Sequence, residues 1–327
     1  MRFSRNFEGH AKGRLKVAKL DLVVRLQDGR PVGYCEYGAE GGLPVIALHG
    51  TPGSRRKYGL ADAEARRIGL RIISVDRWGY GLTAWPKGRF ELRDYASDIE
   101  EFADALGLQK FGVVGISGGG PFAAVIAALL PERVSALALV APVSPLSEPH
   151  ERVGVSPFHR FAFRVLPRLP GAVPFVFSYF RLALFVAPPV AIRTMASRAG
   201  RTDRKVLLRK ETSRDLVTTF RAGLAKGVKG AAIDMRCFSR GWNIDLSAIA
   251  CPARMWIGDK DRNVPVSAAK RLASSVAQMD VIEDADAGHF WVIEHHPEVL
   301  SWLKDRMVEV AREPQKDKAP ARSAQAP

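Results

Sequence analysis

The fold is decided by the stretch VVGISGGGPF at residues 113–122, in which a serine stands between glycines. The β-branched run before Ser117 predicts a strand, and the apolar run from Pro121 to Leu130 predicts a helix directly after it. Glycines remove the Cβ atoms that would collide in so tight a turn. Residues 115–119 match the G-x-S-x-G pattern of a nucleophile elbow, although a plain glycine-rich strand-to-helix connection would look the same in isolation.

Strand and helix patterns alternate on both sides of this turn. Short apolar runs that suit strands covered on both faces recur at residues 44–49, 71–76, 134–141 and 252–258. An Asp28-Gly29 pair between two strand-like runs predicts a β-hairpin ahead of them. The alternation predicts an α/β fold, with a mostly parallel twisted sheet and helices on both of its faces. His49, Asp76 and Ser117 would then lie at the carboxyl ends of strands, where such sheets carry catalytic groups.

The alternation stops between residues 143 and 245, where proline, phenylalanine and arginine are frequent and no strand pattern is visible. We expect a helical cap over 143–245, inserted between two parts of the core at 21–142 and 246–312. Its most apolar part is residues 171–189, but Arg181 and the prolines at both ends argue against a membrane span.

The two ends of the chain differ from the core in composition. Residues 1–20 are basic and lack periodicity, and they predict a basic N-terminal arm without the apolar stretch of a signal peptide. Residues 313–327 are rich in proline, lysine and alanine, and they predict a disordered tail. Cys35, Cys237 and Cys251 are few, odd in number and far apart, which favours a reducing compartment and a cytoplasmic location.

The chain carries a formal net charge of +15, and basic residues outnumber acidic ones in the predicted cap. A direct count over residues 143–245 gives 18 Lys and Arg residues against 7 Asp and Glu residues. No helix-turn-helix, zinc-finger or RNP pattern is present, so we expect no nucleic-acid partner. An arginine-rich surface without a specific partner is the simpler interpretation, and peripheral contact with an anionic membrane stays open.

A serine hydroxyl is a poor nucleophile unless a base takes its proton and an acid orients that base. After the cap the chain offers Asp259 and Asp261 directly behind a strand, and then His289 in a late loop. Nucleophile, acid and histidine in this order are typical of one hydrolase architecture.

The sequence resembles the α/β-hydrolase superfamily from about residue 22 to residue 310, and within it the capped bacterial serine hydrolases. The motifs that carry the resemblance are HGTPGS at 49–54, DRWGYG at 76–81, GISGGGP at 115–121, GDKDRNVP at 258–265 and GHFWVIEHHPE at 288–298. Five motifs in the expected order are far more specific than any one of them.

The resemblance implies a role for each matching residue. Ser117 would be the nucleophile and His289 the general base. The family pattern G-x-x-D-x-x-V-P selects Asp261 as the acid, with Asp259 as its rival. The backbone N–H groups of Thr51 and Gly118 would form the oxyanion hole.

The remaining polar residues near these motifs are expected to be structural. His49 would brace the oxyanion loop, and Asp76 would tie down its own turn. His295 and His296 would be solvated residues ahead of a closing helix that begins at Pro297.

The implied activity is cleavage of a carboxylic ester or similar acyl bond of a small lipophilic or anionic molecule through an acyl-enzyme, with no cofactor or metal. Dehalogenases and epoxide hydrolases of this fold carry Asp at the elbow, so Ser117 argues against both. The alternatives are a C–C bond hydrolase or a proline-iminopeptidase-like peptidase on the same triad, or a ligand receptor without activity.

Overall fold

The computed structural model describes residues 18–145, 161, 165–169 and 171–312. The predicted tail at 313–327 lies outside the described residues, as do most of the predicted arm and part of the predicted cap. The last residues of the predicted arm, Lys19 and Leu20, already belong to the first strand.

Within the described residues, eight strands form one sheet in the order β1-β2-β4-β3-β5-β6-β7-β8. Their bounds are β1 Lys19–Arg25, β2 Pro31–Gly38, β3 Leu43–Leu48, β4 Leu70–Val75, β5 Phe111–Ile116, β6 Val134–Val140, β7 Ala253–Gly258 and β8 Met279–Asp284. β1 and β2 form the hairpin predicted around Asp28-Gly29, and β2 runs antiparallel to β4. All other neighbours are parallel, which confirms the mostly parallel sheet.

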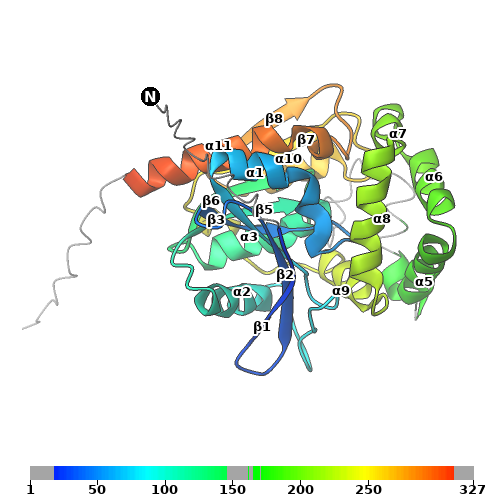
Figure 1. Cartoon of the computed structure of the whole chain (residues 1–327), viewed down its shortest axis with the longest axis horizontal. Coiled ribbons are helices and arrows are strands. Elements are labelled where there is room, and N and C mark those ends of the chain that lie inside the picture. Colours follow the sequence, from blue (N-terminus) through cyan, green and yellow to red (C-terminus); the bar gives the residue numbers. More distant parts are fainter. Residues whose placement is uncertain (1–17, 146–160, 162–164, 170, 313–327) are drawn as a thin grey trace, which may run out of the picture.

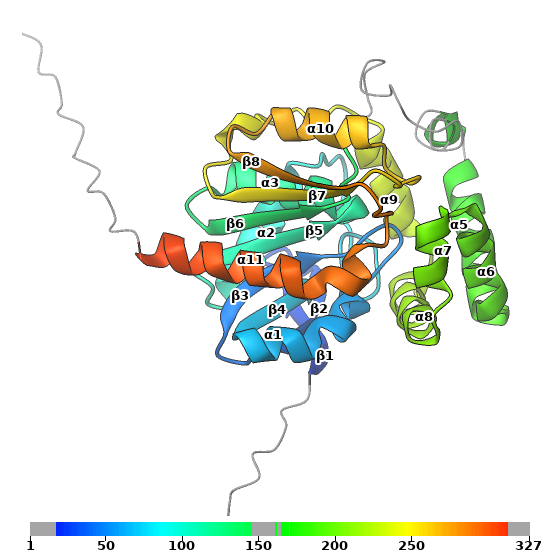
Figure 2. The same cartoon turned by 90° about the horizontal axis from the view of Figure 1, so that it is seen from above.

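Helices cover both faces of this sheet (Figures 1 and 2). One face carries α1 (Asp62–Ile68) and α11 (Val292–Arg312), which pack with the sheet in one apolar cluster. A second cluster joins the other face to α2 Asp94–Ala105, α3 Gly120–Leu129 and α10 Val266–Ser274. The predicted α/β fold with helices on both faces is therefore confirmed.

Four helices, which we call the cap helices, lie to one side of the sheet (Figure 2). They are α5 Ala172–Val186, α6 Pro188–Arg198, α7 Arg201–Leu207 and α8 Lys210–Leu224. Their own apolar cluster includes Leu184, Ile192, Leu207, Leu216 and Phe220. None of the helices in the described part of the chain is both long and apolar enough to cross a bilayer.

Helix α9 (Lys229–Phe238) follows the cap helices but packs with the core. Its side chains Ile233 and Phe238 belong to the same apolar cluster as α2 and α3. The sequence pattern alone did not show this, because a helix carries the same 3.6-residue period whether it packs on a cap or on a sheet. The boundary of the cap at residue 245 stays a prediction.

The closing helix differs from its prediction. It begins at Val292, five residues before Pro297, and its backbone leaves helical geometry at His295 (φ −115°, ψ 20°). The prediction that His296 is solvated is wrong, because its side chain packs against the ring of Tyr58 and is only 5% exposed. Burial lowers the pKa of His296 to about 3, so this imidazole is neutral.

The turn after β5 leaves no room for side chains at its glycines. Gly119 has an ordinary backbone conformation (φ −78°, ψ −19°), but a Cβ there would stand 2.5 Å from the carbonyl oxygen of Leu48. We therefore expect Gly119→Ala to lower the free energy of unfolding by roughly 1–3 kcal/mol through overpacking alone. Urea denaturation measures this change.

Gly41→Ala is the matched control, since a Cβ at Gly41 meets nothing within 4 Å. Its free energy of unfolding should stay within about 0.5 kcal/mol of that of the unmodified chain. Equal effects of the two substitutions would contradict the steric explanation.

Candidate active site

The predicted site residues converge at the carboxyl ends of neighbouring strands. Ser117 follows β5 directly, and residues 49–51 follow β3. Asp261 lies in the loop between β7 and α10, and His289 lies in the loop between β8 and α11. Parallel strands end at the same edge of a sheet, so residues that are 172 positions apart come within hydrogen-bond distance there.

Ser117 occupies the tip of the sharp turn between β5 and α3. Its φ is +53°, a left-handed conformation that non-glycine residues rarely adopt. The turn is closed behind it, since the N–H of Val143 donates to the carbonyl oxygen of Ser117 at 3.0 Å. The Ser117 Oγ lies 3.0 Å from the Nε2 atom of His289, so the strained turn presents the hydroxyl to the imidazole.

The other ring nitrogen of His289 meets a carboxylate. Its Nδ1 lies 2.8 Å from the Oδ2 atom of Asp261, and both side chains are buried. Oδ1 of Asp261 accepts the N–H groups of Asn263 and Val264 at 2.7 and 2.8 Å, which fixes the carboxylate in its loop. Asp259, the rival acid, is exposed to solvent.

The pKa of His289 reflects two opposing influences. Burial lowers this pKa because the cation loses its hydration. The charge of Asp261 and its hydrogen bond act in the opposite direction and prevail, so the pKa of His289 lies above its usual value of 6.5. An imidazole held in this way can accept a proton from the serine and keep it during a reaction.

Thr51 and Gly118, the predicted oxyanion donors, lie side by side. A Cβ added to Gly118 would collide with the Oγ1 atom of Thr51, and one added to Gly50 would stand 3.3 Å from the Cβ of Ser117. The loop after β3 therefore runs against the serine turn at a distance that only glycine allows.

A buried ion pair holds this loop. Arg77 forms a bidentate ion pair with the carboxylate of Asp234, and neither side chain is more than 1% exposed. The same guanidinium donates to the carbonyl oxygens of His49 and Gly50 at 3.1 and 3.2 Å. Thr51 donates its hydroxyl to Asp234 at 2.5 Å. Asp234 thus fixes the Thr51 side chain from helix α9.

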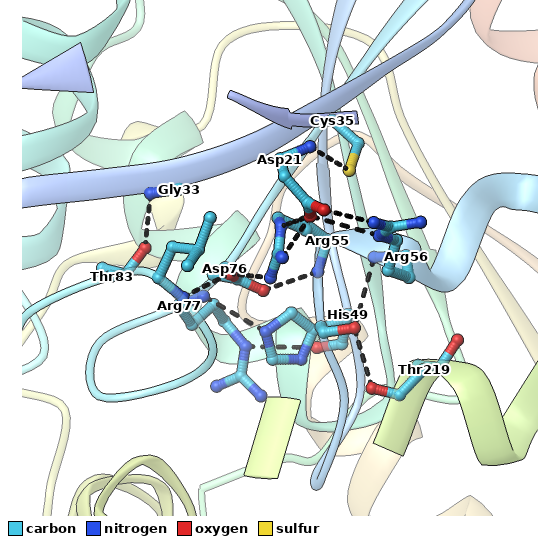
Figure 3. A network of polar contacts seen from close by, with 12 residues as sticks. Asp21, Gly33, Cys35, His49, Arg55, Arg56, Asp76, Arg77, Thr83 and Thr219 are labelled. Atoms are coloured by element: carbon cyan, nitrogen blue, oxygen red, sulfur yellow. Dashed lines mark hydrogen bonds and ion pairs between the residues drawn. The ribbon is translucent and has the colours of Figure 1, made fainter. Parts of the chain in front are cut away.

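His49 and Asp76 make the contacts expected of structural residues (Figure 3). The His49 ring is buried, its Nε2 accepts the N–H of Arg77 at 3.1 Å, and burial followed by the charge of Arg77 lowers its pKa well below 6.5. Asp76 accepts the N–H groups of Arg55 and Leu82, at 2.7 and 2.9 Å, and pairs with the Arg55 guanidinium. Both residues therefore stabilise the turns after β3 and β4.

Asp203 is a site residue that sequence reasoning missed. It lies on cap helix α7, is 2% exposed, and accepts the N–H groups of His289 and Phe290 at 3.0 and 2.9 Å. Its carboxylate also contributes to the raised pKa of His289. Gly288 is required beside it, because a Cβ there would collide with the carboxylate.

Asp203 and Asp234 share a weak signal that could have been used. They are two of only seven acidic residues in a segment of 18 basic ones, and each stands within a helical pattern on its apolar side. A buried carboxylate requires partners, which here come from the core. No spacing in the sequence shows which loops they reach.

A pocket of about 280 Å³ opens above the serine. Ser117 and His289 line it together with residues 49–53 of the loop after β3. Its apolar lining comes from Ile116, Val176, Phe177, Phe180, Met195, Leu216, Phe220, Phe290, Val292 and Ile293. The cap helices therefore supply most of the apolar surface that a substrate would meet.

The sequence model of the α/β hydrolase fold family matches residues 44–296, and the chain belongs to this family. A structure described as an esterase from Exiguobacterium antarcticum superposes with a TM-score of 0.63 at 18% identity, covering 88% of this chain and 100% of the other. At this identity the likeness extends to the fold.

Two curated relatives carry the name non-heme chloroperoxidase. The protein from Streptomyces lividans is 33% identical over 125 residues, which are 38% of this chain and 45% of that protein. The chain thus spans less than half of that relative. The protein from Burkholderia pyrrocinia is 26% identical over 258 residues, which are 75% of this chain and 84% of the other.

We expect Asp203→Asn to lower kcat/KM for p-nitrophenyl esters by roughly 10- to 100-fold, because an amide can accept only one of the two N–H groups and loses a charged hydrogen bond. The acidic limb of the pH profile should also move to lower pH, since one influence that raises the pKa of His289 is removed.

Asp104→Asn, which removes the charge of an exposed carboxylate paired with Arg133, is the control and should change neither quantity. A fall in activity with an unmoved pH limb would show that Asp203 supports the fold alone.

Proposed function

We propose that this hydrolase cleaves a carboxylic ester or similar acyl bond of a small lipophilic molecule through an acyl-enzyme on Ser117. The observation that supports the proposal most strongly is the hydrogen-bonded line from Ser117 through His289 to Asp261 at the wall of an apolar pocket. The esterase among the structural neighbours is consistent with this reaction, although its likeness to this chain extends to the fold alone.

In the proposed reaction His289 takes the proton of Ser117 while the serine oxygen attacks the carbonyl carbon. The backbone N–H groups of Thr51 and Gly118 then stabilise the negative charge on the carbonyl oxygen, where one donor can be worth about 3 kcal/mol. His289 returns its proton to the leaving group, and later takes a proton from the water that hydrolyses the acyl-enzyme. Asp261 orients the imidazole and stabilises its cation throughout.

The lining of the pocket favours a lipophilic acyl group over a peptide. Among the described residues that line it, none is an aspartate or glutamate, and the cationic ones are Lys57 and Arg198 in addition to its histidines. The amino group of a peptide would find no carboxylate there, which argues against the iminopeptidase alternative. A substrate with an anionic end fits the two cations, so the anionic option is retained. A cytoplasmic location, favoured by three buried unpaired thiols, stays part of the proposal.

Ser117→Ala should abolish hydrolysis of p-nitrophenyl esters, with kcat reduced by a factor on the order of 10⁶. A fluorophosphonate probe should label the unmodified protein and leave Ser117→Ala unlabelled, as read by intact mass. Ser197→Ala, on the exposed surface of α6, is the control and should label fully.

Two results would contradict the proposed nucleophile. The first is hydrolysis that survives Ser117→Ala. The second is an unmodified protein that binds esters without hydrolysing them or reacting with the probe, as a receptor would.

The pH dependence of kcat/KM should show an acidic limb with an apparent pKa above 6.5, because neutral His289 is the active form and its pKa is raised. In Asp261→Asn the carboxylate that raises the pKa of His289 is gone, while the burial that lowers this pKa remains. The limb should therefore move to lower pH, while kcat falls by roughly 10⁴.

Asp259→Asn tests the rival acid directly. With its side chain exposed, this variant should retain kcat within about twofold and keep the limb in place. A larger loss in Asp259→Asn than in Asp261→Asn would reverse the assignment.

A further inference from the structure

Helix α5 is apolar on the side that faces away from the cap. Phe175, Tyr179, Leu182 and Val186 follow the i, i+4, i+7, i+11 spacing of one helix face and are 75%, 72%, 60% and 74% exposed. The opposite side of the helix buries Val173 and Leu184. A helix that is apolar all round is normally covered all round, so the outer side lacks the environment that its sequence predicts.

Val176 of α5 and Val190 of α6 extend this surface, with 45% and 56% of their area exposed. We call these six residues the α5 face. Figures 1 and 2 both show α5 and α6 on the side of α8 that is turned away from the sheet. The α5 face therefore lies on the outer surface of the cap.

Positive charge borders the α5 face. The guanidinium groups of Arg181 and Arg221 both lie over the ring of Phe185, 5.0 and 5.5 Å from its centre. Arg181 donates to the carbonyl oxygen of Leu224, and Arg221 donates to that of Leu184. A direct count over residues 171–210 gives eight Lys and Arg residues and one acidic residue, the buried Asp203.

The charge distinguishes between two occupants of this surface. A second copy of the chain would bring the same positive charge to the contact and would be repelled. The headgroups of an anionic bilayer would be attracted, and their acyl chains would receive the apolar side chains. The combination of an apolar helix face and cationic flanks is that of a helix lying in a membrane interface.

The α5 face also leads to the active site. A second cavity, of about 390 Å³, is lined by Phe175, Val176, Tyr179 and Val190 of this face. The lining that it shares with the pocket above Ser117 consists of Val176, Phe180, Met195, Arg198, Asn263 and Phe290. A lipophilic molecule that entered between α5 and α6 would thus meet mainly apolar side chains on its way to the serine, with Arg198 and Asn263 as the polar members of the shared lining.

We propose that the α5 face docks this protein on an anionic lipid bilayer and that the substrate ester enters from the bilayer through this second cavity. The docking is inferred from the α5 face and its charge alone, while the entry of an ester rests on the proposed function. The substrate class would be esters of low water solubility that partition into membranes.

The docking is tested by sedimentation with vesicles. The Ser117→Ala protein should bind vesicles of phosphatidylcholine with one quarter phosphatidylglycerol, and should bind pure phosphatidylcholine vesicles much less. Leu182→Ser/Val186→Ser removes apolar contact without adding charge, and neither side chain lines a cavity described above. This double variant should lower the partition coefficient roughly tenfold or more, since two exposed apolar groups no longer insert.

Val23→Ser, at an exposed position of strand β1, is the control and should bind as the parent does. The double variant made on the active chain should hydrolyse p-nitrophenyl acetate at an unchanged rate without vesicles, which verifies its fold.

The docking proposal is overturned if the parent does not bind anionic vesicles, or if the double variant binds equally well. It is also overturned if the parent does not bind vesicles but sediments as a dimer in sedimentation velocity, and the double variant sediments as a monomer. Failure of the proposed function shows separately, as p-nitrophenyl acetate hydrolysis that survives Ser117→Ala.

Discussion

The arrangement of the site depends on one ion pair with almost no contact with water, between Arg77 and Asp234. The guanidinium lies on the turn after β4 and the carboxylate on α9, and the loop that carries Thr51 is bonded to both. Removing one member of a buried, hydrogen-bonded pair typically costs about 3–5 kcal/mol, because the other charge is left without a partner. Three segments far apart in the sequence thus keep one relative position beside Ser117.

The cap contributes to this order from its inner side. Asp203 on α7 accepts backbone N–H groups of the His289 loop. Asp234 on α9, which lies outside the cap helices, accepts the hydroxyl of Thr51 in a similar way. Two of the few acidic residues of a basic segment are turned toward the core in this way. Asp203 is the one acidic residue of α5, α6 and α7, so its burial leaves cationic side chains as the charged groups on the outer surface of these three helices.

The sheet could be predicted because it depends on short-range patterns, and the resemblance to a family supplied the proposed roles of Ser117, Asp261 and His289. β-branched runs, the Gly-Ser-Gly turn and the position of Asp261 in its motif are each readable within about ten residues. The partners of Asp203, Asp234 and the buried His296 could not be predicted, since each side chain acquires them through packing between elements that are distant in sequence. The same limit applies to α9, because its apolar period indicates that one side of the helix is buried but does not indicate which element covers that side.

The carboxylate of Asp203 has a consequence for how such enzymes diversify. An inserted lid is often treated as an interchangeable module that alters substrate choice while the core performs the chemistry. In this protein cap helix α7 supplies the acceptor for the backbone N–H groups of His289 and Phe290, so the cap and the proposed catalytic site are connected through Asp203. A chimera that carries a cap from another protein on this core would therefore need an acceptor for the N–H groups of His289 and Phe290 before its new pocket could act on a substrate.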